Sequence, residues 1–330
     1  MFNYNQWYVV ATQKSVKKKP IAITVLKTPL VLFKVDEEFV VLEDRCPHKN
    51  APLSLGHIKN NRLVCGYHGW SFKKDGELEN IPSQNSVFRC GVKSYKTQVY
   101  NGLIWVFMNP EMEPSKNLAL TKFSASFKQM TFFNKMKSNA DLILENALDC
   151  THTAFLHDGL FRASSSLEKS SSTIIQDKNS LSVRTHEVNP SNSLAMKFLG
   201  KGDVNHVDTY LPPNTMNITY EKGFLTNTTQ LHATPIDERN SLVFTTVHIK
   251  APVFISSVIC WFLRPIILVV IRQDKKILEA QTKCIATFGK RHFRSVKADL
   301  ASNTFFSMYQ KVHEGEEIIK KAQRTIEYNL

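Results

Sequence analysis

The first third of the chain is built from short runs of β-branched and aromatic residues. Such runs occupy residues 21–26, 30–35, 39–42 and 103–107, and turn residues such as Lys27-Thr28-Pro29 interrupt them. Runs of about four to eight residues with this composition are typical of β-strands. The pattern therefore predicts an all-β domain over residues 1–110.

The remaining two thirds mix two periodicities. Asn109-Pro110 and the following Glu113-Pro114-Ser115 mark a linker, which we place at residues 111–135. Beyond it, residues 242–249 are typical of a strand, whereas three segments have helical spacing, at residues 145–157, 271–281 and 300–328. We therefore expect an α+β protein, whose second domain covers residues 136–330.

The segment from Glu145 to His157 has a polar face. Glu145, Asp149 and His152 are spaced for one side of a helix, and Asp158-Gly159 supplies a stop signal. His152 and His157 are five residues apart, which on a regular helix separates them by about 140°. They can bind one metal only if the helix loosens or bulges, as helices do at functional sites.

Residues 252–271 form the most apolar segment. Its twenty residues are long enough to span a bilayer, but Arg264-Pro265 lies at its centre. A central arginine costs about 2.5–3.5 kcal/mol on insertion scales. A buried or pocket-lining segment is therefore favoured, and a helix lying at a membrane surface is the alternative.

Composition and charge agree with a globular enzyme. The chain has 330 residues, 42% of them hydrophobic, and a formal net charge of +13. Such a charge attracts anionic lipid or acidic proteins, but no nucleic-acid-binding motif accompanies it, so nucleic acid is not expected as a partner. Cys90, Cys150, Cys260 and Cys284 have no obvious pairing, and no basic stretch precedes an apolar run at the N-terminus, so the sequence favours the cytoplasm.

Two cysteine and histidine pairs carry the candidate redox chemistry. Cys46 and His48 are followed after sixteen residues by Cys65 and His68. Two thiolates on one iron and two imidazoles on the other form a Rieske [2Fe–2S] cluster, which passes single electrons. A structural zinc site is the alternative, but its frame usually keeps cysteines together and histidines together.

The flanks of these pairs resemble the Rieske domain of ring-hydroxylating and demethylating oxygenases. The resemblance rests on Arg45-Cys46-Pro47-His48 and on Tyr67-His68-Gly69-Trp70. Downstream, Asn146, Asp149, His152 and His157 are similar to the N-x2-D-x2-H-x4-H motif of vanillate demethylase-like enzymes. Two histidines and one carboxylate are the facial triad of non-haem Fe(II) oxygenases.

This resemblance implies roles for several residues. His152 and His157 would bind a mononuclear Fe(II), and Asp149 would connect that site to the cluster of a neighbouring subunit, which implies a homotrimer. The family's catalytic domain has a helix-grip fold, an antiparallel sheet around helices. Electrons would come from an NAD(P)H-dependent flavin and iron–sulfur reductase or a ferredoxin, and O2 would be the co-substrate.

Asp274 is the candidate for the third iron ligand. Helical spacing places it on one face with Ile277, Leu278 and Gln281, so it should point inward, and a desolvated carboxylate needs a metal or donors. Its surroundings also match the family's Q-D-x-x-I pattern. The alternative role for Asp274 is to cap a surface helix. In that case Glu279 and Asp299 are the reserve candidates for the third ligand.

The resulting hypothesis is the oxygenase component of a Rieske monooxygenase that hydroxylates or demethylates a small, aromatic or hydrophobic molecule. The alternatives are a sterol- or lipid-modifying oxygenase at a membrane surface, a Rieske electron carrier without oxygenase activity, and a zinc-stabilised binding protein. Residues suspected of lining the substrate pocket are Phe155, Leu160, Met196, Phe198, His232 and Phe244.

Overall fold

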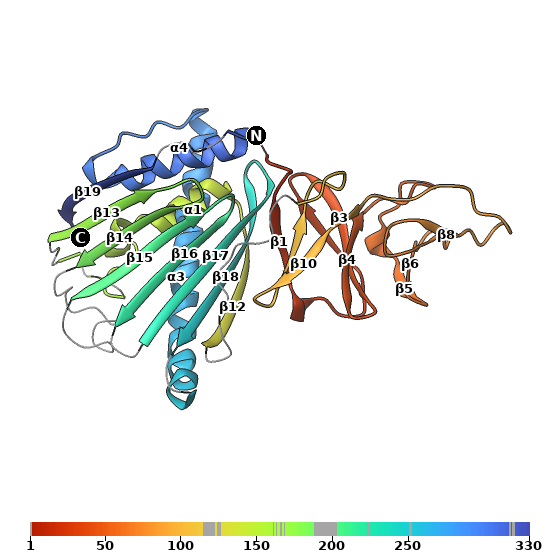
Figure 1. Cartoon of the computed structure of the whole chain (residues 1–330), viewed down its shortest axis with the longest axis horizontal. Coiled ribbons are helices and arrows are strands. Elements are labelled where there is room, and N and C mark those ends of the chain that lie inside the picture. Colours follow the sequence, from red (N-terminus) through yellow and green to blue (C-terminus); the bar gives the residue numbers. More distant parts are fainter. Residues whose placement is uncertain are drawn as a thin grey trace. The chain divides into compact units, whose positions relative to one another are not determined.

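The structure is a computed structural model, and the chain divides into two compact units at residues 2–122 and 123–330 (Figure 1). It describes residues 2–114, 123, 127–160, 162, 164–165, 167, 169–187, 203–222, 225–250, 253–316, 318 and 321–330. Each unit has its own hydrophobic core.

The smaller unit contains three antiparallel sheets and no α-helix among its described residues. The first has the order β1-β11-β10, with β1 at Trp7–Thr12, β11 at Leu103–Phe107 and β10 at Thr97–Tyr100. The second has the order β2-β3-β4-β9, at Ile21–Val25, Thr28–Val35, Glu38–Glu43 and Ser94–Tyr95. The third joins β5 to β8, at His57–Lys59, Arg62–Val64, Ser71–Phe72 and Leu78–Asn80. The strands predicted from the first third are confirmed.

Strand β3 shows why these runs are apolar throughout rather than alternating. Leu30 and Leu32 pack into one core cluster, whereas Val31 and Phe33 pack into another. Successive side chains of a strand point to opposite faces, so a strand between two cores must be apolar on both.

The larger unit is an eight-stranded antiparallel sheet that packs with three α-helices among its described residues. The strand order is β12-β18-β17-β16-β15-β14-β13-β19. In chain order the strands are Phe127–Met136, Lys169–Gln176, Leu181–Glu187, Val204–Leu211, Thr215–Lys222, Leu225–Asp237, Asn240–Lys250 and Ala322–Asn329. Helices α1 (Ala140–Leu148), α3 (Val253–Phe288) and α4 (Leu300–Glu314) share one core cluster with the sheet, and α3 runs behind the strands in Figure 1. This is the α+β arrangement that was predicted.

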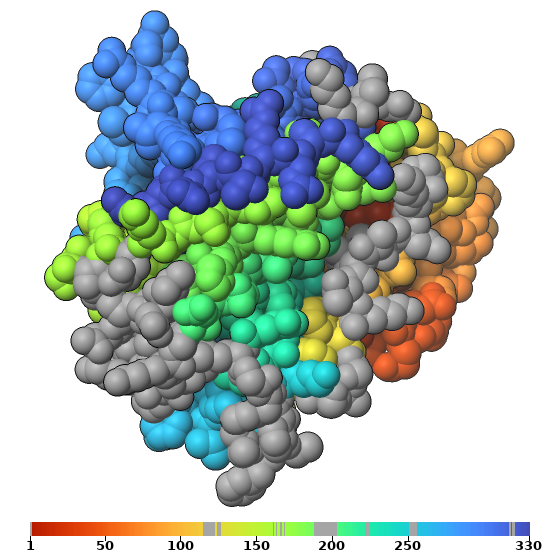
Figure 2. All heavy atoms as spheres, turned by 60° about the vertical axis from the view of Figure 1, so that its left-hand side comes forward, coloured from red at the N-terminus to blue at the C-terminus, as the bar shows by residue number. Residues whose placement is uncertain are grey.

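Two element boundaries differ from the sequence prediction. The helix predicted through residue 328 ends at Glu314, because Gly315 takes a left-handed conformation (φ 78°) that caps the helix. The chain then forms β19, which pairs with β13 along the edge of the sheet (Figure 2). Residues 127–135, expected to be linker, belong to the edge strand β12.

From Val253 onward, the apolar segment and the Asp274 segment form one long helix, α3, with Pro265 inside it. By length and composition this helix could cross a membrane, yet only 11% of its most apolar window is buried within the protein. Trp261 is 73% exposed. The prediction of a buried or pocket-lining segment is therefore wrong for most of its described residues.

Candidate functional site

The two cysteine and histidine pairs lie in turns with the same backbone geometry. Asn50 N–H donates to the Cys46 carbonyl, and Gly69 N–H donates to the Cys65 carbonyl, and both donors have positive φ (57° and 74°). Each cysteine N–H then closes its turn by donating to the carbonyl five residues ahead, at Ala51 and Trp70. Of these two turns, only the second joins paired strands, β6 and β7.

The four side chains of these turns converge. The ring centroids of His48 and His68 are 4.4 Å apart, and Trp70 stacks on His48 at 4.7 Å with an interplanar angle of 3°. Burial, with a further contribution from neighbouring Cys65, raises the pKa of the Cys46 thiol to about 11, so a metal would have to displace its proton. The buried Nδ1 of His48 has no hydrogen-bond partner. Two buried thiols and an imidazole nitrogen without a partner fit a [2Fe–2S] cluster.

A glycine brings the first turn close to the second. A Cβ at Gly56 would lie 2.0 Å from the carbonyl oxygen of Val64, the residue before Cys65. Only glycine permits this approach. Gly56, at the end of the Pro52–Gly56 stretch, therefore allows the backbone after the first turn to lie against the backbone before the second.

Helix α1 ends immediately before the candidate iron residues, so the predicted helix through His157 is wrong. Asp149 has an extended conformation (ψ 109°), and its carboxylate accepts hydrogen bonds from Thr151 N–H (2.8 Å) and Thr151 Oγ1 (2.6 Å). This local bond competes with helix continuation and begins a 3-10 turn at Thr151–Ala154. On a continuous helix, His152 and His157 would point about 140° apart and could not bind the same metal. The break in the helix removes this restriction.

The structure brings His152, His157 and Asp274 together. One potential ligand atom from each lies within 4.8 Å of the others. Asp274 Oδ1 is 3.1 Å from His157 Nε2 and 3.7 Å from His152 Nε2. The imidazole rings are nearly perpendicular, at 76°. Two histidines and a carboxylate around one point are the donor set of a mononuclear Fe(II) site.

Both imidazoles are oriented by a hydrogen bond at Nδ1. His152 Nδ1 faces the backbone carbonyl of Asp149, and His157 Nδ1 lies 2.8 Å from Gln273 Oε1. Because oxygen acceptors occupy the Nδ1 side, the Nε2 lone pairs are available at the centre. Burial also lowers the pKa of His152, which favours the neutral form that binds metals. Gln273 is a residue that sequence reasoning missed, although it stands next to Asp274.

Asp274 reaches the centre from the inner face of α3. The buried residues of this part of the helix are Ile271, Leu278 and Thr282, whereas Ile277 is 48% exposed and was misplaced by the prediction. The reserve ligands have other partners. Glu279 accepts from Lys137 N–H at 3.0 Å, and Asp299 accepts from Val296 N–H at 2.8 Å.

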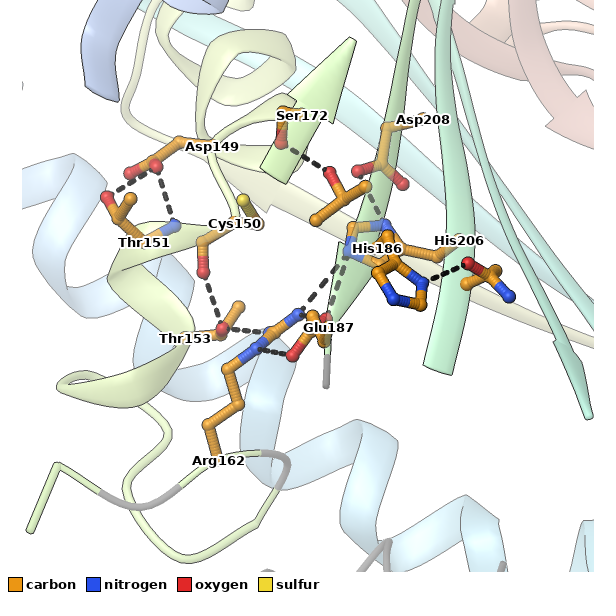
Figure 3. A network of polar contacts seen from close by, with 12 residues as sticks. Asp149, Cys150, Thr151, Thr153, Arg162, Ser172, His186, Glu187, His206 and Asp208 are labelled. Atoms are coloured by element: carbon orange, nitrogen blue, oxygen red, sulfur yellow. Dashed lines mark hydrogen bonds and ion pairs between the residues drawn. The ribbon is translucent and has the colours of Figure 1, made fainter. Parts of the chain in front are cut away.

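A buried charge network lies beside the 3-10 turn (Figure 3). Arg162 forms two hydrogen bonds with the Glu187 carboxylate and donates a third to Thr153 Oγ1. His206 lies between two acids, with Nε2 3.2 Å from Glu187 and Nδ1 2.9 Å from Asp208. The network thus fastens the turn that carries His152 to strands β14 and β15.

Sequence reasoning missed this network, although strand alternation contains its signal. The inward positions of β14 are Leu181, Val183, Thr185 and Glu187, so they become polar toward one end of the strand. In β15, His206 and Asp208 occupy the inward positions opposite that end. Charged residues at inward strand positions indicate a buried polar site.

The stability of this network should depend on pH through His206. Burial alone would lower its pKa, but attraction to Asp208 and hydrogen bonds to Asp208 and Glu187 outweigh burial and raise it to about 9. A histidine whose pKa is raised by folding stabilises the fold. The contribution is complete at pH values below the pKa of the unfolded state, about 6.5, and it disappears as the pH rises through the pKa of the folded state, about 9. We expect the melting temperature to exceed that of His206→Gln at pH 6, with the difference shrinking above pH 9. A difference that is constant from pH 6 to 10 would show that His206 is not charged in the fold.

The residues suspected of lining a pocket have different surroundings. Phe244 and His232 are 1% exposed on the sheet, whereas Phe155 is 64% exposed, and Leu160 is intermediate. Met196 and Phe198 lie outside the described residues. Other buried polar side chains on strands β16 to β18 include Asn217, Gln230, Thr246 and His248.

Family comparisons match both units. The family described as Rieske [2Fe-2S] domain matches residues 6–96. The family described as vanillate O-demethylase oxygenase C-terminal domain matches residues 136–315, which is more than half of the 330-residue chain.

Known sequences and structures resemble the chain as well. It is 31% identical over 162 residues to the vanillate O-demethylase oxygenase subunit of a Pseudomonas species, covering 48% of the chain and 46% of the relative. It is 29% identical over 163 residues to the oxygenase component of dicamba O-demethylase from Stenotrophomonas maltophilia, covering 47% and 48%. The chain thus spans about half the length of the curated relatives it matches.

Solved structures share the fold over nearly the whole chain. Dicamba monooxygenase bound to 3,6-dichlorosalicylic acid superposes with a TM-score of 0.82 at 21% identity, covering 95% of this chain and 98% of that one. Pseudomonas putida NdmA with caffeine gives a TM-score of 0.76 at 21% identity, covering 94% and 91%.

Proposed function

Because the chain belongs to the Rieske oxygenases whose C-terminal domain is of the vanillate O-demethylase type, we propose that it is the terminal oxygenase component of a Rieske non-haem iron monooxygenase. It would use O2 and electrons from a reductase to hydroxylate or oxidatively demethylate a small, aromatic or hydrophobic molecule. The observation that carries this proposal is the His152, His157 and Asp274 group in the unit beyond the Rieske domain.

Two donor sets would hold the metals. The cluster would be bound by Cys46, His48, Cys65 and His68, and Fe(II) by His152, His157 and Asp274. When bound, the cluster supplies single electrons and the mononuclear iron supplies a site for activating O2. A plain electron carrier would need no second donor set, and a structural zinc site seldom mixes cysteine and histidine within each pair.

The protein's own contribution is orientation. The Asp149 carbonyl and Gln273 fix the ring positions of His152 and His157, so that both Nε2 atoms face the Asp274 carboxylate. Arg162 holds the intervening turn through Thr153. Such outer contacts commonly change metal affinity or activity by about 10- to 100-fold when they are removed.

Asp149 is the proposed link to a neighbouring subunit. Its carboxylate is 3.8 Å from His152 Nδ1 and remains 27% exposed. An acid that touches an iron-ligand turn and still reaches solvent can accept a hydrogen bond from another chain. This role requires the homotrimer that the family resemblance implies.

The remaining partners follow from the proposed reaction. Electrons would come from an NAD(P)H-dependent flavin and iron–sulfur reductase or from a ferredoxin, and the enzyme would work in the cytoplasm. The similarity to the vanillate and dicamba demethylase oxygenase subunits supports demethylation as one outcome.

Metal analysis tests the proposal. The protein purified without oxygen should be brown and contain about three irons and two labile sulfides per chain, the third iron being the mononuclear one. Reduced protein given O2 and a methoxylated aromatic acid, as a probe, should release formaldehyde or form a hydroxylated product. Stoichiometric zinc in a colourless protein would exclude the oxygenase.

A further inference from the structure

Helix α3 presents one continuous exposed stripe along its length. Apart from the adjacent Trp261 and Phe262, its members recur every three or four residues, which is the spacing of a single helix face, and each is exposed. We call this the outer stripe, and it consists of Val258, Trp261, Phe262, Pro265, Val269, Arg272, Lys276, Ala280, Lys283 and Thr287.

The outer stripe changes chemistry at its middle. From Val258 to Val269 every member is apolar, and Trp261 and Phe262 are 73% and 51% exposed. From Arg272 onward its charged members are all basic. Arg264 lies beside the apolar part but is not a member of the stripe, and its guanidinium lies over the Phe132 ring at 5.4 Å.

The opposite face of the same helix is fixed in the core. Ile271 and Leu278 belong to the buried cluster, and Ile259, Leu263 and Ile267 pack against it. Asp274 also faces inward, at the candidate iron site. The helix therefore cannot leave the domain to cross a bilayer, although its length and apolar composition would allow a crossing.

The part of α3 from Val258 to Val269 is consequently apolar on both faces but covered on only one. A helix that is apolar all round is normally buried, and a continuous exposed apolar patch marks an interaction site. Trp261 and Phe262 are suited to a membrane interface, where aromatic side chains sit at the level of the headgroups.

We propose that the outer stripe docks on the surface of an anionic phospholipid bilayer. The side chains from Val258 to Val269 enter the interface, while Arg272, Lys276 and Lys283 contact lipid phosphates. Basic residues near a membrane surface are attracted to anionic lipid, and the formal net charge of +13 acts in the same direction. This inference does not rest on the proposed oxygenase activity.

A second copy of the chain fits the outer stripe less well. If two stripes packed in parallel, the basic halves would face each other and repel. If they packed antiparallel, each basic half would be buried against an apolar half without acidic partners. Burying cations without partners is costly, whereas lipid phosphates pair with them.

Vesicle binding tests the proposal with the full, metal-loaded chain. Sedimentation should recover the protein with vesicles that contain phosphatidylglycerol, much less with pure phosphatidylcholine, and progressively less as salt is added. Trp261→Ser combined with Phe262→Ser should lower the partition coefficient by about tenfold or more. The matched control is Phe133→Ser, which removes an aromatic ring that is 55% exposed on β12, and it should bind as the wild type does.

Charge variants separate the two halves of the outer stripe. Arg272→Gln and Lys276→Gln should each weaken binding to the anionic vesicles by about fivefold. Lys178→Gln, in the exposed turn between β13 and β14, should have little effect. Unchanged Rieske absorption and iron content would show that every variant is folded.

Three results would overturn the proposal. The first is wild-type protein that does not bind anionic vesicles. The second is a Trp261 and Phe262 double variant that binds as strongly as the wild type. The third is a Phe133→Ser control that loses as much binding as the double variant does. Light scattering without lipid identifies the competing occupant. If the Trp261 and Phe262 variant has a smaller oligomeric mass than the wild type, the stripe is a contact between subunits.

Discussion

Replacing His157 by alanine should abolish turnover and remove about one iron per chain, while the Rieske absorption and the two labile sulfides remain. His157 is 1% exposed, and its Nε2 lies 3.1 Å from Asp274 Oδ1. Removing one of three donors from a facial triad leaves too few ligands to hold Fe(II). The cluster should survive because its donors belong to the other compact unit.

Iron and sulfide analysis, with the visible spectrum of the same sample, measures both sites at once. His186→Ala is the matched control, because this histidine is exposed on β14 and bonds Asn205. Asp274→Ala should behave as His157→Ala does. Loss of the Rieske spectrum in either variant would show that the ligands are misassigned, and full iron retention in Asp274→Ala would require a different third ligand.

Replacing Asp149 by asparagine should slow electron transfer from the Rieske cluster to the mononuclear iron by about 10- to 100-fold, with both metal sites intact. Asparagine keeps an oxygen that can accept from Thr151, so the 3-10 turn should form. The backbone carbonyl that orients His152 is unchanged. The substitution therefore removes mainly the charge.

Single-turnover oxidation of the reduced cluster, followed by its absorbance, measures this step. Asp177→Asn serves as the control, since Asp177 also accepts backbone hydrogen bonds in a turn, the exposed one before β14. The trimer hypothesis adds that dissociated, fully metallated monomers should be inactive. An Asp149→Asn protein that oxidises its cluster at the normal rate would contradict the bridging role.

Local sequence determined the parts of the site whose residues are neighbours along the chain. The spacing of Cys46 with His48 and of Cys65 with His68 defines two short turns, and hydrogen bonds between residues four or five positions apart suffice to close them. The strands of the first unit were predictable for the same reason, because β-branched runs and turn residues act locally. Asp149 likewise ends α1 through a bond to Thr151, two residues away.

Only the tertiary structure decided which distant residues meet. Asp274 approaches His157 across 117 positions, and Arg162 pairs with Glu187 in a network whose members look like ordinary polar strand and loop residues.

Tyr328 and its neighbours form a strand rather than a helix because the β13 edge offers backbone partners that no local preference reveals. The apolar pattern of residues 252–271 predicted burial for the segment as a whole, whereas only one face of α3 packs against the core. The exposure of the other face depends on how much of the helix the sheet covers, and hydrophobic periodicity alone does not contain that quantity.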